Sequence, residues 1–333
     1  MQDKGGISME LKMRSNTAVQ SNFIESRAFT RLKEVATSHH RWKHLVLRIF
    51  IYVTLANFAF VFLLPFIYMI STSLKSSVDL VDPYVNWIPV RGIEWKNYLA
   101  SIKALDYWRT LGNSLFLSTV CTLGHVLSCS FAAYAFARIS FPGKGFLFIL
   151  VILTIIVPAQ VIIIPLYIIN NRLGLNTLLG GYLPLMLPTF MGMGLRGGLF
   201  IFIYRQLFMG IPNELEEAAY IDGCNIFRTY WNIVMPIAKA ATLVTSILSI
   251  VWHWNDYYEP GFYILSLKRT LLPMMLPKMQ MVIDRGGEEE IIEMFNIAVR
   301  MGAVFLAILP MLIMYFFLQK RFMEGIERSG LVG

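Results

Sequence analysis

Charged residues are scarce in this chain, since Asp, Glu, Lys and Arg together make up 15% of its 333 residues. Hydrophobic residues make up 56%, and the mean hydropathy is +0.58. Soluble globular domains carry about 25% charged residues. The composition therefore excludes an ordinary soluble domain and is typical of a protein that crosses a membrane several times.

The sequence also lacks the short motifs of common enzyme classes. It contains no GxxxxGK[ST] phosphate-binding loop, no HExxH zinc motif, no CxxC pair and no GxSxG turn. Its cysteines, Cys121, Cys129 and Cys224, form no disulfide framework. We therefore expect a non-catalytic membrane protein, with no catalytic residue and no metal or cofactor bound by the chain itself.

The net charge of +8 does not require a nucleic-acid partner, because basic residues beside anionic lipid explain the excess. His39, His40 and His44 raise the alternative of a metal site. Because Arg41 and Lys43 lie among them just before an apolar run, we favour a basic patch at the membrane surface.

Six apolar runs are long enough to cross the hydrocarbon core, which takes roughly 20 helical residues. They cover residues 47–70, 111–137, 146–169, 182–202, 241–258 and 297–318. We predict an all-α, polytopic membrane protein with six transmembrane helices. Prolines interrupt the middle spans, and such breaks survive only where neighbouring helices or a water-filled path satisfy the freed carbonyls.

The chain divides into four predicted segments. Residues 1–44 form a cytoplasmic N-terminal tail, and residues 45–108 the first transmembrane helix with an extracytoplasmic loop. Residues 109–318 form the transmembrane core, and residues 319–333 a cytoplasmic C-terminal tail. Both termini are placed in the cytoplasm because basic residues gather in the connection 138–144 and in the tail.

Polar residues inside the predicted spans are few. Those that could line a substrate path are Asn113, Ser114, Gln160 and Asn170. The alternative is that each bonds a neighbouring helix. His125 is isolated within its span. The aromatic residues of the loop 73–109 could stack on sugar rings, although a belt at the membrane interface is the simpler interpretation.

Residues 213–236 form a polar insert between two apolar runs. Pro212 stops the preceding element, and Asn213 with Glu216 is predicted to form a capping box at the start of a short helix. Gly223 is predicted to end that helix in a left-handed conformation. A second short amphipathic segment follows, so the insert is an elbow suited to a groove in a soluble partner.

The elbow resembles the EAA motif, E-A-A-x-x-x-G-x9-I-x-L-P, of permease subunits of binding-protein-dependent ABC importers. Glu217-Ala218-Ala219, Gly223, Ile233 and Pro236 match it, and Met235 replaces the usual Leu. The resemblance extends over residues 48–333 and is greatest to the sugar, or maltose-type, branch. It implies that an ATPase docks on Glu216, Glu217, Ala218, Ala219, Asp222, Gly223, Cys224, Ile233 and Pro236.

The resemblance further implies a type I importer permease in a bacterial cell membrane. Its partners would be a second permease subunit, two ATPase subunits that use ATP and Mg, and an extracytoplasmic binding protein that delivers a sugar. Two alternatives are weighed against it. An ion-coupled secondary transporter would need intramembrane Asp, Glu or His for its coupling ion, and a membrane-embedded glycosyltransferase would need clustered carboxylates or a metal site.

Overall fold

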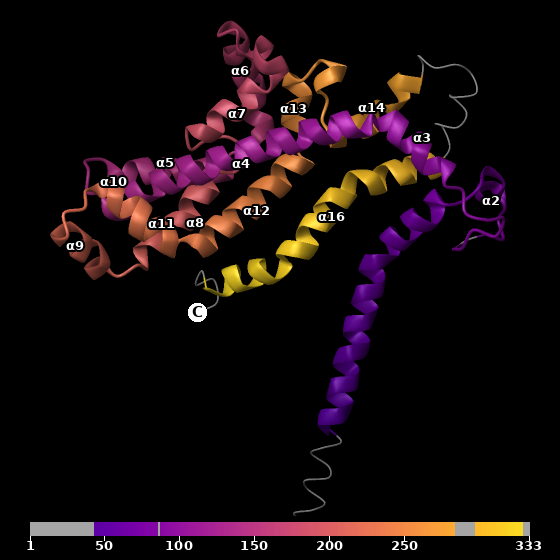
Figure 1. The fold of residues 1–333 in the computed structure, drawn as a ribbon, viewed down its shortest axis with the longest axis horizontal. Coiled ribbons are helices and arrows are strands. Elements are labelled where there is room, and N and C mark those ends of the chain that lie inside the picture. Colours follow the sequence, from indigo (N-terminus) through magenta and orange to yellow (C-terminus); the bar gives the residue numbers. More distant parts are fainter. Residues whose placement is uncertain (1–42, 86, 284–296, 329–333) are drawn as a thin grey trace, which may run out of the picture. The chain divides into compact units, whose positions relative to one another are not determined.

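The computed structural model describes residues 43–85, 87–283 and 297–328. Within these ranges the chain forms helices and turns and no strand, so the predicted all-α class is confirmed (Figure 1). Most of the predicted N-terminal tail, including His39 and His40, lies outside the described residues.

The described chain divides into two units, the first ending at Tyr68 and the second beginning at Met69. The first unit contains most of a 31-residue helix, Lys43–Ser73, which is long and apolar enough to cross a membrane. Its large side chains are exposed, Phe50 by 66% and Phe62 by 72%. An apolar surface of this kind is stable in lipid and unfavourable in water. The four-segment division stays a prediction.

The second unit is built from short and long helices. They are α2 (Ser77–Val81), α3 (Lys96–Leu105), α4 (Tyr107–Arg138), α5 (Lys144–Ile156), α6 (Ala159–Arg172), η1 (Leu175–Gly181), α7 (Leu183–Phe190), α8 (Gly197–Met209), α9 (Asn213–Ile221), α10 (Ile226–Thr229), η2 (Tyr230–Val234), α11 (Met235–Ile237), α12 (Lys239–Asn255), α13 (Tyr258–Tyr263), η3 (Leu267–Arg269), α14 (Leu272–Ile283) and α16 (Ile297–Arg328).

The 32-residue helix α4 is the centre of this unit and packs against α7, α8 and α12 (Figure 1). Helix α16 packs against α12 and α3. Both α4 and α16 have the length and composition of membrane spans, as the sequence predicts. Trp254 of α12 donates from Nε1 to the carbonyl of Ala307 in α16 at 3.3 Å, which satisfies its buried N–H.

The third predicted span is not straight. Helices α5 and α6 meet at an angle of 105°. Pro158 cannot donate a backbone hydrogen bond and disfavours helical geometry at the residue before it, and Val157 accordingly adopts an extended conformation. The proline in the sequence predicted an interruption here, but the size of the bend depends on packing.

The fourth and fifth predicted spans also differ from continuous helices. Residues 182–202 contain α7 and the beginning of α8, separated by a turn at 191–196. Helix α12 follows a 78° bend after Ile226–Ile237 and has 17 residues. The described helices therefore give three long spans, or up to five when each bent pair counts as one, together with the shorter apolar helix α8.

Close helix approach explains one of the glycines in the predicted fourth span. A Cβ atom on Gly198 of α8 would lie against Thr154 Oγ1 and 2.8 Å from the carbonyl oxygen of Val151, both in α5. No side chain fits there without moving the backbone. Small residues permit such contacts between membrane helices.

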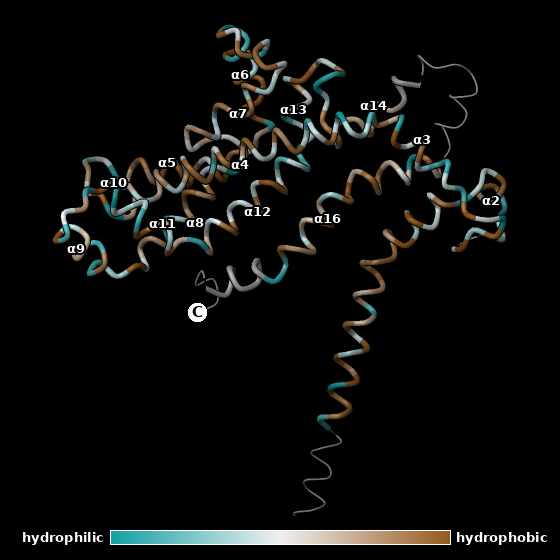
Figure 2. The backbone as a smooth tube through the Cα atoms, in the orientation of Figure 1, coloured by the Kyte–Doolittle hydropathy of each residue, from teal (hydrophilic) through white to brown (hydrophobic). Residues whose placement is uncertain are grey.

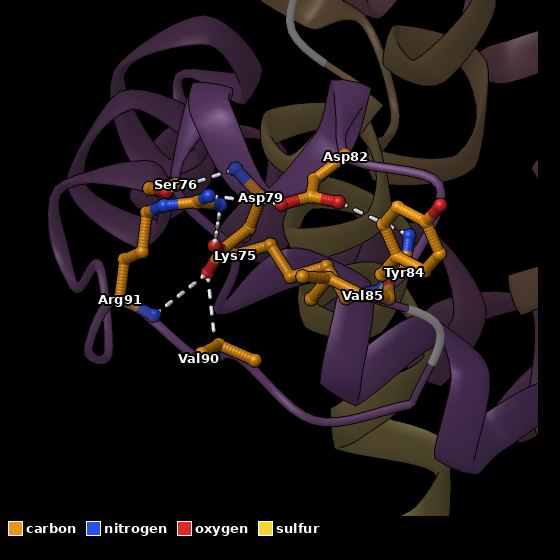
Figure 3. A network of polar contacts seen from close by, with 8 residues as sticks. All are labelled: Lys75, Ser76, Asp79, Asp82, Tyr84, Val85, Val90 and Arg91. Atoms are coloured by element: carbon orange, nitrogen blue, oxygen red, sulfur yellow. Dashed lines mark hydrogen bonds and ion pairs between the residues drawn. The ribbon is translucent and has the colours of Figure 1, made fainter.

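The loop after the first helix is held together by a buried carboxylate (Figure 3). Asp79 accepts from the backbone N–H groups of Val90 and Arg91 at 3.1 and 3.2 Å, and its Oδ1 lies 2.8 Å from the Arg91 guanidinium. Arg91 also bonds Asp82 at 2.9 Å. The side chain of Asp79 is fully buried. Charge-assisted bonds of this kind compensate the burial of an ionised group.

Candidate functional site

The elbow, residues 213–236, begins with helix α9, along which hydrophilic residues gather (Figure 2). Pro212 precedes the helix with a φ of −56° and a ψ of 135°, and no side chain caps the helix N-terminus. The predicted Asn213–Glu216 capping box is therefore wrong. Both side chains point instead to α4, where they find a stronger donor than the backbone N–H groups at the helix start.

That donor is Arg138, the last residue of α4. Its Nε lies 2.8 Å from Glu216 Oε1, and its two terminal nitrogens donate to Asn213 Oδ1 and to the carbonyl of Ile211. Tyr134, one turn earlier on α4, donates to Glu216 Oε2 at 3.2 Å. Glu216 is only 6% exposed. An isolated carboxylate at such a site would be costly, so Arg138 and Tyr134 are needed for its burial.

A left-handed turn joins the two arms of the elbow. Gly223 has a φ of 80°. Its N–H donates to the carbonyl of Tyr220 at 3.1 Å, and that of Cys224 donates to Ala219 at 2.9 Å, which satisfies the last carbonyls of α9. A Cβ on Gly223 would meet nothing within 4 Å. The requirement for glycine is therefore conformational and does not come from crowding by the described residues.

The second arm is capped at its start and anchored on α4 through Tyr230. Asn225 caps α10, its Oδ1 accepting from the N–H of Arg228 at 2.9 Å. Tyr230 is 1% exposed, and its hydroxyl lies 2.7 Å from Ser130 Oγ on α4. Its ring also packs near that of Tyr134, with centroids 5.3 Å apart. Both arms of the elbow therefore have an anchor on α4.

Between these anchors the elbow exposes a mixed apolar and acidic surface. The exposed large apolar residues are Leu215 (44%), Tyr220 (44%), Ile221 (86%), Ile226 (46%), Phe227 (61%) and Trp231 (50%). Glu214, Glu217 and Asp222 are exposed beside them. An apolar patch rimmed by charge on an otherwise anchored segment is typical of a docking surface for a protein.

The structure separates the residues implied by the EAA motif into three groups. The first group is exposed and contains Glu217, Ala218, Asp222, Gly223 and Pro236. The second group is half-buried and contains Cys224 and Ile233. Glu216 and Ala219 are buried, Ala219 with 3% exposure. Glu216 thus contacts α4 and has no free carboxylate on the elbow surface.

The sequence interpretation missed Arg138 and Tyr134 as site residues. It used Arg138 only as one of the basic residues that set membrane orientation, and that role needs no partner. The sequence did offer one indication of an ion pair: Arg138 lies at the end of a predicted span, and an acidic helix follows later in the chain.

Of the predicted path residues, Asn113, Ser114 and Asn170 make contacts between elements of the second unit. Asn113 donates to the carbonyls of Lys268 and Thr270 at 3.0 and 3.1 Å. Ser114 accepts from the N–H of Leu272 at 2.8 Å. Asn170 donates to the hydroxyl of Tyr263 at 3.3 Å, and Gln160 is exposed on α6. Their role in a substrate path stays a prediction.

His125 is not isolated, contrary to the sequence interpretation. Its Nδ1 lies 3.1 Å from Ser249 Oγ and its Nε2 lies 3.0 Å from the carbonyl of Met193. The ring of His253, one turn beyond Ser249 on α12, has its centroid 5.2 Å from that of His125. Residues far apart in the sequence thus form a polar contact at the crossing of α4 and α12.

Comparison with known proteins decides the family. Residues 124–326 match the family described as binding-protein-dependent transport system inner membrane component. The chain belongs to this family. The match begins within α4 and extends through the elbow into α16. It establishes a multi-pass membrane component of a transport system and favours the importer interpretation over both alternatives.

Curated relatives of this permease cover most of its length. The probable starch degradation products transport system permease protein AmyC of Thermoanaerobacterium thermosulfurigenes is 27% identical over 263 residues, which cover 79% of this chain and 89% of the relative. The arabinooligosaccharides transport system permease protein AraQ of Halalkalibacterium halodurans is 26% identical over 281 residues, covering 84% and 94%.

A solved structure shares the fold. The permease superposes with a TM-score of 0.69 on a chain from the crystal structure of a bacterial ABC transporter involved in the import of the acidic polysaccharide alginate. The match covers 83% of this chain and 96% of that chain at 24% identity. The predicted type I importer permease fold is thereby confirmed.

Proposed function

We propose that this chain is a transmembrane permease subunit of an ATP-driven importer, and that its cargo is a sugar or oligosaccharide delivered by an extracytoplasmic binding protein. The named substrates of its relatives support the choice of carbohydrate, since starch products and arabinooligosaccharides are both carbohydrates. The chain itself is non-catalytic in this proposal. ATP and Mg are used by two separate ATPase subunits, and a second permease completes the membrane path.

One observation carries the proposal: the elbow exposes apolar side chains although both of its arms are fixed to α4. Ile221 is 86% exposed, next to Asp222 and the left-handed Gly223. Exposing such residues to water is unfavourable unless a partner covers them. A lipid surface fits poorly, because Glu214, Glu217 and Asp222 would be repelled by anionic headgroups. We assign the cover to a groove in a soluble ATPase, the partner that the resemblance to the EAA motif implies.

In the proposed topology the elbow and both termini face the cytoplasm of a bacterial cell. Closure of the two ATPases around ATP would draw together the elbows of the two permeases. Rigid segments then rotate about a central site and expose it alternately to the two sides of the membrane. The elbow transmits force and makes no contact with the sugar.

The proposal is tested by purifying the tagged chain in mild detergent from its native host and identifying the proteins that accompany it by mass spectrometry. We expect an ATPase with a Walker A motif, a second permease and an extracytoplasmic binding protein. The ligand released from that binding protein is expected to be a carbohydrate. Solute transport by the purified chain alone, driven by an ion gradient, would contradict the importer, and a peptide or inorganic ion in the binding protein would contradict the sugar.

A further inference from the structure

The side chain of Arg138 is directed entirely to the beginning of the elbow. Each of its three guanidinium nitrogens contacts a different oxygen acceptor there, on Ile211, Asn213 and Glu216. The first of these precedes α9 and the other two lie in its first turn. A planar guanidinium with several acceptors fixes the orientation of its partner as well as its distance.

Helix α4 is also bonded at its opposite end and along its length. Asn113 and Ser114, in the second turn of α4, bond the segment from Lys268 to Leu272. Near the middle, Thr122 donates to Ser249 Oγ of α12 at 3.1 Å. A helix of 32 residues is about 48 Å long, so α4 connects the elbow with contacts across the thickness of a membrane.

We propose that Arg138 is a positioning residue for transport, which carries displacement of the ATPase-docked elbow into α4. This inference rests on the proposed function, because it presumes that an ATPase moves the elbow. Coupling between distant sites needs a physical element whose state both sites bias. The single ion pair of Arg138 with Glu216, together with its contacts to Asn213 and Ile211, is such a link between α4 and the start of α9. The Tyr230–Ser130 bond of the second arm keeps the remainder of the elbow on the same helix.

A positioning role predicts a specific pattern of losses in Arg138→Gln and Glu216→Gln. Both variants keep the exposed side chains of the elbow, so the ATPase should co-purify in normal amounts. Uptake per ATP hydrolysed by the complex in proteoliposomes, with binding protein and ligand, should fall by about fivefold or more, the lower range of coupling between sites. The double variant should lose no more than either single variant, because both changes break the same contact.

Two further variants separate transmission from folding. Arg138→Lys keeps the positive charge, but an ammonium group cannot contact all three acceptors on Ile211, Asn213 and Glu216 in the same geometry. Uptake per ATP should therefore be higher than in Arg138→Gln and lower than in the unmodified chain. Arg205→Gln is the matched control. Arg205 contacts the carbonyl of Phe136 at 3.3 Å and lies 4.1 Å from the centroid of the Phe148 ring, and these contacts tie α8 to α4 and α5. Uptake per ATP should be unchanged in this control.

Two results would overturn the inference. Normal uptake per ATP in Arg138→Gln would show that the contact carries no displacement, and loss of the ATPase from Arg138→Gln and Glu216→Gln complexes would show that the pair only shapes the docking surface. If Arg138→Gln fails to accumulate, Tyr134→Phe, which removes one bond to Glu216, gives the same comparison in milder form. Failure of the proposed function has a separate result, because the unmodified chain would then purify without any ATPase.

Discussion

Glu216 and Glu217 are consecutive residues of α9 with opposite environments. Glu216 is 6% exposed and lies 2.8 Å from the guanidinium of Arg138, whereas Glu217 is exposed. Helix geometry separates neighbouring side chains by about 100°, so one carboxylate can face the core of the protein while the next faces a partner. The two acids therefore have different consequences when they are replaced.

Reversing the exposed charge should weaken docking of the ATPase. In Glu217→Lys we expect recovery of the ATPase with the tagged permease to fall several-fold. The permease itself should accumulate normally, because Glu217 is exposed and its carboxylate supports no buried contact. The measurement is quantitative mass spectrometry of the purified complex.

The control for Glu217→Lys is a charge reversal outside the elbow, Lys239→Glu at the start of α12. We expect this variant to retain the ATPase, because position 239 follows the docking surface and does not belong to it. Equal ATPase recovery from Glu217→Lys and Lys239→Glu would contradict the prediction.

A substitution at position 223 should be tolerated only if the new residue can adopt the positive φ of the turn. Asn tolerates positive φ better than other non-glycine residues, whereas a β-branched residue is strained there by about 1–2 kcal/mol or more. We expect Gly223→Asn to retain uptake and Gly223→Val to lose most of it, with both proteins inserted in the membrane. The readouts are uptake and ligand-stimulated ATP hydrolysis in proteoliposomes. Normal values for Gly223→Val would show that the turn is not needed for docking.

The loop around Asp79 should resist mild acid. Burial alone would raise the pKa of Asp79, but the backbone and side-chain hydrogen bonds of Arg91 and the N–H of Val90 together lower it below its ordinary value. A carboxyl group whose pKa is lowered in the folded state stabilises the fold above its unfolded pKa, near 4, and loses that effect as the pH falls through the lower folded value.

Hydrogen exchange of the loop between the first helix and α3 should therefore be equally slow at pH 7 and pH 5, after correction for the intrinsic rate, and should accelerate only below about pH 4. Asp79→Asn removes the charge and should expose the loop to exchange at every pH. Loss of protection between pH 7 and pH 5 in the unmodified chain would show that another group controls the loop.

Helix packing at Gly198 should be sensitive to any added side chain. Gly198→Ala places a methyl group against Thr154 Oγ1 and the carbonyl of Val151, and we expect a loss of about 1–3 kcal/mol in stability. Gly112→Ala on α4 is the matched control, because its Cβ would meet nothing within 4 Å and its φ is not positive. The measurement is the thermal midpoint in one detergent, which should fall for Gly198→Ala only. Equal midpoints would contradict the close approach of α5 and α8.

The elements that the sequence predicted well are those set by local chemistry. Apolar runs of sufficient length located α4, α16 and the first helix, because burial in hydrocarbon depends on composition over about 20 residues. The turn at Gly223 followed from a helical stripe that ends at a glycine. These features need no knowledge of which helices become neighbours.

The contacts that the sequence did not predict all join distant segments. Arg138 and Glu216 lie on helices separated by α5, α6, α7 and α8, and His125 and Ser249 are still farther apart in the chain. Nothing in the local pattern selects one acceptor from several. The capping box failed for the same reason, because Asn213 had a local donor and a tertiary donor available, and the charged tertiary donor was the stronger.

The break at Pro158 leaves α5 too short to cross a bilayer by itself. A straight span that is too long for its membrane tilts, and one that is too short thins the lipid around it. Helix α5 has 13 residues and reaches only about 20 Å, short of the roughly 30 Å of the hydrocarbon core. Because the two helices meet at 105°, α6 does not continue along the axis of α5, and the depth that this segment reaches is not set by its residue count alone.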